Sequence, residues 1–123
     1  MRALTILAAV AVLTHGQFAL ADDVAKGKEI YNGVGACASC HGELGKGDGI
    51  AAAALTPKPR SFSEGTFAFD TDKDGKTGTE HDLFNVVTNG AAAYGGSMLM
   101  AGRPDIAEAD RKALVKYVMS LHK

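Results

Sequence analysis

Cys37, Cys40 and His41 form a C-x-x-C-H motif, and their side chains are the ones in this sequence best suited to holding a cofactor covalently. Two thiols separated by two residues lie on one tight helical turn, from which both can add to the vinyl groups of a haem. The histidine that follows directly is then placed to bind the iron. The sequence therefore predicts one covalent haem c, held by Cys37 and Cys40 and bound through its iron to His41.

Two other chemistries share part of this motif. Cysteine pairs in exported proteins often form a disulfide, and C-x-x-C also marks redox-active dithiols of the thioredoxin type. A thioredoxin-type dithiol lies beside a βαβ pattern, and the sequence shows no such pattern. A histidine directly after the second cysteine is the signature of haem attachment, so haem is the favoured interpretation.

The first 21 residues have the features of a secretory signal peptide. Arg2 is followed by an apolar stretch that ends at Leu13, and an Ala-x-Ala cleavage site ends at Ala21. The apolar stretch is shorter than the roughly 20 residues that a membrane anchor requires. We therefore predict that residues 1–21 are cleaved as a signal peptide and that residues 22–123 form one exported, periplasmic domain.

The composition of the mature domain restricts its partners. Removal of Arg2 changes the formal net charge from −1 to −2, and such a balance favours neither nucleic acid nor an anionic membrane surface. No second apolar stretch approaches spanning length, so no stable membrane insertion is expected after processing. The full sequence has no Trp and 15 Gly, which makes the core modest, and a buried haem would add apolar mass to it. We expect a monomer.

Three segments have the apolar spacing of amphipathic helices. They are residues 23–32, 79–89 and 107–121. Thr79 and Asp82 form a capping-box-like start for the second segment. The glycines and prolines between the first two segments exclude a continuous helix there. No segment alternates like a strand, so the sequence predicts an all-α domain of helices and glycine-rich loops.

The chain resembles the class I cytochromes c, and specifically the small bacterial monohaem proteins among them. The resemblance covers nearly all of the mature chain. It implies the class I cytochrome c fold, in which the first and last helices cross at Gly27 and pack Tyr31 and Tyr117 near the crossing. The matching segments, in chain order, are Gly27 and Tyr31, Cys37-Ala38-Ser39-Cys40-His41-Gly42, Gly45-Lys46-Gly47-Asp48-Gly49, Pro57-Lys58-Pro59-Arg60, Thr88-Asn89-Gly90 and Leu114-Val115-Lys116-Tyr117-Val118.

The resemblance implies a methionine as the second axial ligand, on the side of the iron opposite His41. Met98 and Met100 are the candidates because both lie in the loop before the last helix, and the resemblance favours Met100. Thioether ligation raises the reduction potential, and two filled axial positions leave no open site for a substrate. His81 and His122 are rival ligands that we expect to be surface histidines.

The resemblance also implies contacts around the ligands. His41 is expected to donate its other ring N–H to a backbone carbonyl, which fixes the orientation of the ring, and Pro57 or Pro59 is expected to provide that carbonyl. Arg60 is expected to pair with a haem propionate, because its guanidinium fork matches a carboxylate.

The function implied by this resemblance is transfer of single electrons between redox partner proteins, without enzymatic activity. The leading hypothesis is a diffusible periplasmic carrier that docks transiently with an electron donor and an acceptor. A second hypothesis is a dedicated electron-transfer subunit of one periplasmic redox enzyme. A third is a ligand-binding or peroxidase-like haem protein with an open iron, against which the methionine loop argues.

An acidic stretch offers a separate candidate site. Asp70, Asp72, Asp74 and Gly75 match the opening of a calcium loop, but the twelfth position is His81 instead of the usual Glu. We therefore consider a calcium ion at this loop and favour the alternative interpretation, a solvated acidic turn.

Overall fold

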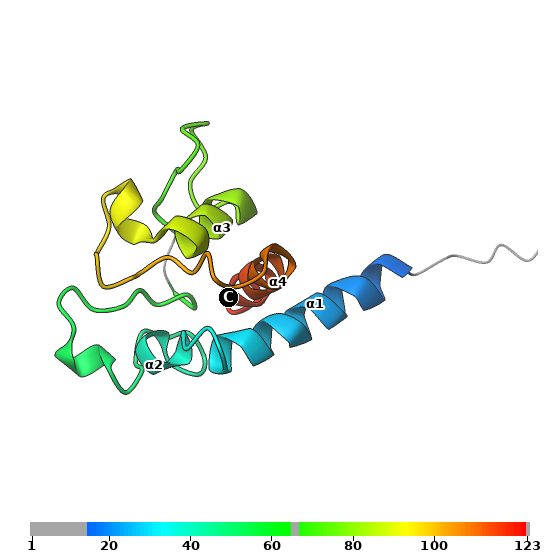
Figure 1. Ribbon diagram of the computed structural model, residues 1–123, viewed down its shortest axis with the longest axis horizontal. Helices are drawn as coiled ribbons and strands as arrows, with labels where there is room; N and C mark the ends of the chain where they lie inside the picture. The colour runs from blue at the N-terminus through cyan, green and yellow to red at the C-terminus, as the bar shows by residue number, and fades with distance from the viewer. Residues whose placement is uncertain (1–14, 65–66, 123) are drawn as a thin grey trace, which may run out of the picture.

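The computed structural model describes residues 15–64 and 67–122, and most of the predicted signal peptide lies outside the described residues. Every regular element in these ranges is helical and none is a strand, which confirms the predicted all-α class (Figure 1). The elements in chain order are α1 (His15–Asn32), α2 (Ala38–His41), the 3-10 helix η1 (Ala52–Ala54), α3 (Glu80–Asn89), the 3-10 helix η2 (Ala91–Tyr94) and α4 (Glu108–Ser120).

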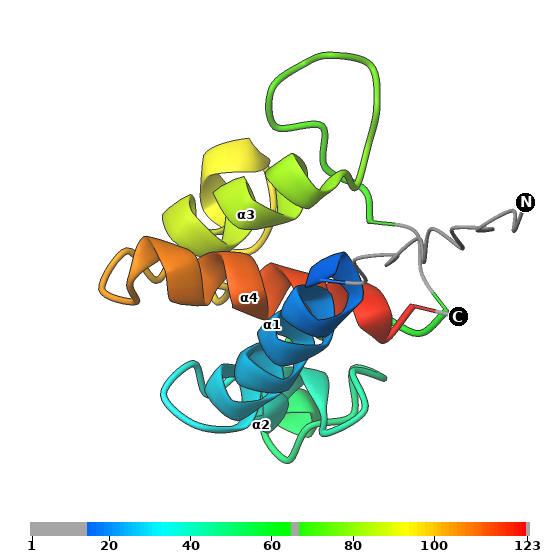
Figure 2. The same ribbon diagram turned by 90° about the vertical axis from the view of Figure 1, so that its right-hand side faces the viewer.

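The packing of α1 across α4 is the centre of the fold (Figure 2). Gly27 makes the crossing close: a Cβ at this position would meet the backbone carbonyl oxygen of Ala113 and lie 2.7 Å from the Tyr117 Cβ. The rings of Tyr31 and Tyr117 pack edge to face beside it, with centroids 5.2 Å apart. The predicted crossing at Gly27 is confirmed.

The core lies between α1, α3 and α4. Tyr31, Leu114 and Val115 are its most deeply buried apolar side chains, each at most 1% exposed. The α3 helix packs against α4 on the side away from α1. The remaining buried members of the core are Ile30, Leu83, Ile106, Tyr117 and Val118.

The predicted helix ends differ from the observed ones to unequal degrees. Thr79 is the N-cap of α3, and its capping box with Asp82 is present as predicted. The α4 helix is one residue shorter at each end than the predicted 107–121. The predicted start of the first helix at Asp23 is wrong, because α1 begins at His15 and continues through the predicted cleavage site after Ala21.

The helical turn predicted at the C-x-x-C-H motif is present as α2. The short elements η1 and η2 were not predicted, because each spans about one helical turn and therefore shows no apolar period. Within the described residues, no helix is both long enough and apolar enough to cross a lipid bilayer.

Candidate cofactor site

A cavity of about 780 Å³ opens between α2, the loop after η1, α3 and the segment before α4. Its volume falls in the range of about 300–1,000 Å³ typical of ligand and cofactor sites. Leu55, Leu83 and Val118 contribute to its apolar wall. Of the predicted site residues, Cys37, Cys40, His41, Arg60 and Met100 line this cavity.

The two cysteines reach the cavity from one helical turn. Cys37 is the N-cap of α2, and its carbonyl accepts the backbone N–H of His41 at 2.9 Å. Both thiols are half-buried and free of a disulfide. Burial raises the pKa of Cys37 to about 11, although the positive charge of Arg103 acts in the opposite direction. The turn therefore presents two free thiols to one cavity, and the thiol of Cys37 is protonated.

His41 is buried, and its ring is held on two sides. Its Nδ1 lies 3.0 Å from the carbonyl oxygen of Arg60, and since a carbonyl can only accept, Nδ1 carries the proton. The ring of Phe62 stacks on the imidazole, with centroids 4.4 Å apart and planes inclined by 23°. Burial lowers the pKa of His41, although the Arg60 contact acts against this. A neutral imidazole with a protonated Nδ1 leaves Nε2 as the atom able to bind a metal.

The predicted source of the His41 contact is wrong. The carbonyl belongs to Arg60 and not to Pro57 or Pro59. The Pro59 carbonyl instead faces Gly47, where an added Cβ would lie 2.6 Å from its oxygen. The two successive carbonyls of Pro59 and Arg60 thus face different partners, Gly47 and His41.

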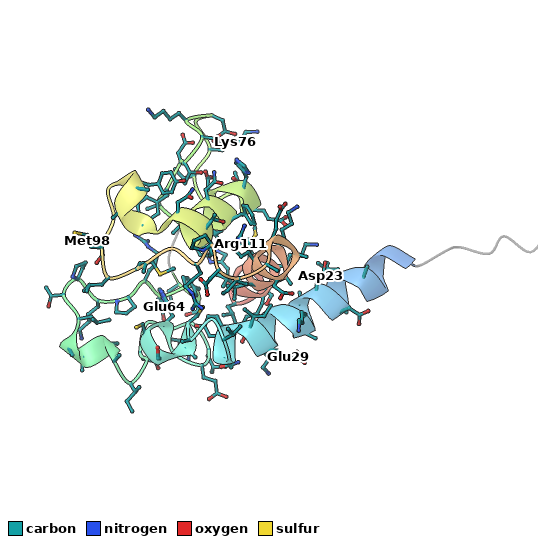
Figure 3. The ribbon with its side chains drawn as sticks, in the orientation of Figure 1. Asp23, Glu29, Glu64, Lys76, Met98 and Arg111 are labelled. Atoms are coloured by element: carbon teal, nitrogen blue, oxygen red, sulfur yellow. The ribbon has the colours of Figure 1, made fainter. Side chains whose placement is uncertain are left out.

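The two methionines have different surroundings. Met100 is half-buried and lines the cavity, and its carbonyl accepts the backbone N–H of Ala91 at 3.0 Å. Met98 is 84% exposed, does not line the cavity and lies at the outer edge of the molecule (Figure 3). The two rival histidines, His81 and His122, are also exposed, and neither lines the cavity.

The two arginines at the cavity have different settings. The Arg60 side chain is exposed at the cavity's edge. Arg103 was not singled out from the sequence. Its Nη1 donates to the Gly35 carbonyl at 3.0 Å, and its Nε and Nη2 each donate to the Asp105 carboxylate at 2.9 Å. Arg103 thereby joins the loop that carries Met100 to the segment that precedes Cys37.

The residues that line the cavity fit a haem c. Two free thiols lie on one turn, and a neutral imidazole has its Nδ1 occupied and its Nε2 open. A thioether from Met100 lines the same apolar cavity. Soft sulfur and imidazole donors in apolar surroundings form one of the ligand sets that bind haem iron in cytochromes c.

The acidic loop gives no support to the calcium ion that the sequence offered as the less favoured alternative. The carboxylates of Asp70, Asp72 and Asp74 lie within 4.8 Å of one another, but those of Asp72 and Asp74 are exposed. Asp70 accepts the backbone N–H groups of Asp74 and Gly75 at 3.1 and 2.9 Å, so the loop satisfies its own donors. The loop projects away from the helices, with Lys76 at its tip (Figure 3).

Asp82 has a structural role that the capping box indicated only in part. It is 1% exposed, and its two oxygens accept the backbone N–H and hydroxyl groups of both Thr71 and Thr79 at 2.7 to 3.0 Å. Burial would raise the pKa of Asp82, but these four hydrogen bonds outweigh it and lower the pKa to about 2. Asp82 thus ties the acidic loop to α3 and has no oxygen left for a cation.

Comparisons with known proteins agree with this site. The family model described as Cytochrome c matches residues 24–122. Among solved structures, the chain is similar to a chain of the reducing HAO-like protein complex of Kuenenia stuttgartiensis, with a TM-score of 0.65 and 31% sequence identity. That match covers 79% of this chain and 41% of the other, so this chain spans less than half the length of the protein it matches. No curated protein matches the chain.

Proposed function

This chain belongs to the cytochrome c family, and we propose that its mature form, residues 22–123, is a periplasmic carrier of single electrons. Family membership implies a covalently bound haem c and transfer of electrons to and from redox partner proteins. The observation that carries the proposal is that Cys37, Cys40, His41 and Met100 all line one apolar cavity.

Each of these residues has a defined task. The thiols of Cys37 and Cys40 would tether the ring, and His41 Nε2 and Met100 Sδ would bind the iron. When bound, the haem supplies an iron that takes up and releases one electron. The Arg60 carbonyl keeps the proton on His41 Nδ1, which raises the basicity of the ligand and fixes its tautomer. We assign the exposed Arg60 side chain to a propionate.

The choice of Met100 over Met98 is supported by burial. A ligand must reach into the cavity, and Met100 lines it, whereas Met98 is 84% exposed. Ligation by both Met100 and His41 would leave the iron no open position. An iron with no open position exchanges electrons but does not bind substrate, which supports a carrier over an enzyme or a ligand-binding protein.

A dedicated subunit of a redox enzyme is the second candidate. It is favoured by the similarity to a chain of a protein complex. The match covers 41% of that chain, so the region similar to this protein is there part of a longer chain. The two candidates differ in solution. A carrier is expected to run as a monomer when purified from its natural host, whereas a subunit is expected to co-purify in fixed ratio with a catalytic chain.

The proposal is tested by optical spectra of the mature protein, produced together with the haem-attachment machinery. We expect haem that stays with the denatured chain, a sharp reduced α band and a weak far-red band in the oxidised protein. The far-red band reports iron–sulfur bonding, so Met100→Ala should abolish it and Met98→Ala should retain it. A high-spin spectrum that shifts with CO would show an open iron, and a chain without covalent haem would contradict the proposal altogether.

A further inference from the structure

Phe62 covers one face of the imidazole that the proposed function assigns to the iron. The two rings are nearly parallel, with centroids 4.4 Å apart. The carbonyl that accepts the proton of His41 Nδ1 belongs to Arg60, two residues earlier in the same loop. One short segment therefore touches His41 both at the edge and on the face of its ring.

A hydrogen bond at Nδ1 alone leaves the imidazole free to tilt about the axis that runs through this contact. A flat ring stacked on the face of the imidazole opposes that tilt. Because one contact lies in the plane of the imidazole and the other perpendicular to it, together they restrict the ring in both directions. We propose that Phe62 is a positioning residue that sets the plane of His41, a role that rests on the proposed ligation by His41.

The segment that carries Phe62 is itself anchored on two sides. The backbone N–H of Phe62 donates to the Gly45 carbonyl at 2.6 Å. The Phe62 carbonyl lies 3.1 Å from His122 Nδ1, beyond the end of α4 (Figure 2). Gly45 has φ +69, and a Cβ there would lie 2.8 Å from Leu121 Cδ1 and 3.1 Å from the Phe62 ring. The glycine loop after the haem motif and the chain end thus hold Phe62 against His41.

Phe67 provides a matched control. Its ring packs against Phe62 with centroids 5.8 Å apart and against His122 at 5.9 Å, so it lies one ring further from His41. Both phenylalanines are half-buried and line the same cavity. Phe62→Leu and Phe67→Leu each replace a phenyl ring by an aliphatic side chain in similar surroundings. Only Phe62→Leu removes a ring contact with His41.

The test compares the two variants as haem-loaded proteins by EPR of the oxidised form and by redox titration. The ferric g-values depend on the orientation of the axial ligand planes, so Phe62→Leu should shift them and Phe67→Leu should not. The smaller leucine side chain of Phe62→Leu would admit water to the face of His41, and water favours the more positively charged ferric state. At the wild-type midpoint potential, the ratio of oxidised to reduced protein should therefore be about threefold higher for Phe62→Leu than for Phe67→Leu, a modest effect for a residue that supports a metal ligand.

Unchanged g-values and an unchanged midpoint in a low-spin Phe62→Leu protein would overturn the positioning role. If Phe62→Leu does not fold with haem attached, the test is made on the wild-type protein. Its reduced form should show NMR cross peaks between ring protons of Phe62 and His41, and their absence would overturn the positioning role. A wild-type protein without low-spin covalent haem is a different result, because it contradicts the proposed function itself.

Discussion

Gly27→Ala tests the closest backbone contact in the fold. The added Cβ would meet the Ala113 carbonyl oxygen and lie 2.7 Å from both the Ala113 carbonyl carbon and the Tyr117 Cβ. Carbon atoms pack without strain at about 3.5–4.0 Å, so α1 and α4 must separate by about 1 Å. The obstacle is the backbone of α4, which cannot rotate out of the way as a side chain can.

The magnitude follows from two opposing effects. Overpacking of this kind costs about 1–3 kcal/mol, and an immovable backbone places this site near the upper end. Alanine in a helix is favoured over glycine by about 1 kcal/mol. We therefore expect Gly27→Ala to lower the free energy of unfolding by about 2 kcal/mol. For a domain of about 100 residues, that corresponds to a fall in Tm of about 8–16 °C.

The assay is thermal unfolding of the oxidised, haem-loaded protein, followed by circular dichroism in the helix band. Lys28→Ala is the control, because Lys28 is the next residue of α1 and is exposed. Its Tm should stay within a few degrees of wild type, since surface substitutions change stability by about 0.5 kcal/mol or less. A Gly27→Ala protein as stable as wild type would refute the close crossing of α1 and α4.

Two further predictions concern Asp82 and Ala36. The pKa of Asp82 is lowered from 3.8 in the unfolded chain to about 2 in the fold. Its contribution of about 2 kcal/mol is therefore fully present above about pH 5 and is lost as the pH falls through 2. In guanidinium titrations between pH 5 and 2, the free energy of unfolding should depend less on pH in Asp82→Asn than in wild type. An equally steep dependence on pH would contradict the lowered pKa of Asp82. Ala36 has φ +52, a conformation that costs a residue with a Cβ about 1–2 kcal/mol. Ala36→Gly should therefore raise the free energy of unfolding by up to about 1 kcal/mol, because glycine's extra freedom in the unfolded chain offsets part of the gain. The control Ala25→Gly in α1 should lower the free energy of unfolding by about 1 kcal/mol. Equal losses of stability in both variants would exclude strain at Ala36.

The sequence predicted those features that depend on residues close together in the chain. The C-x-x-C-H motif lies on one helical turn, and the capping box of Thr79 and Asp82 joins residues three apart. Gly27 identified the crossing of α1 and α4 only through the family resemblance. The family match over residues 24–122 bears out that resemblance.

The start of α1 shows how a local signal can mislead. Asp22 and Asp23 suit the N-terminus of a helix, but the interaction of a carboxylate with a helix dipole contributes only about 0.3–1 kcal/mol. The residues before them include alanine and leucine, which extend a helix at little cost. In the structure α1 therefore continues back to His15, and Asp23 instead pairs with Lys116 of α4 at 2.7 Å.

The contacts around His41 were the least predictable part of the site, and their geometry explains why. The ring meets a carbonyl 19 residues away, and Arg103 bonds to the Gly35 carbonyl across 68 residues. Neither pairing follows an apolar period, because Arg60, Gly35 and Arg103 lie in irregular segments. Which carbonyl faces His41 depends on how Pro59 packs against Gly47, so a shift of one residue exchanges one carbonyl for the next. A motif can therefore identify a ligand, whereas the orientation of that ligand depends on loop packing that only the folded chain determines.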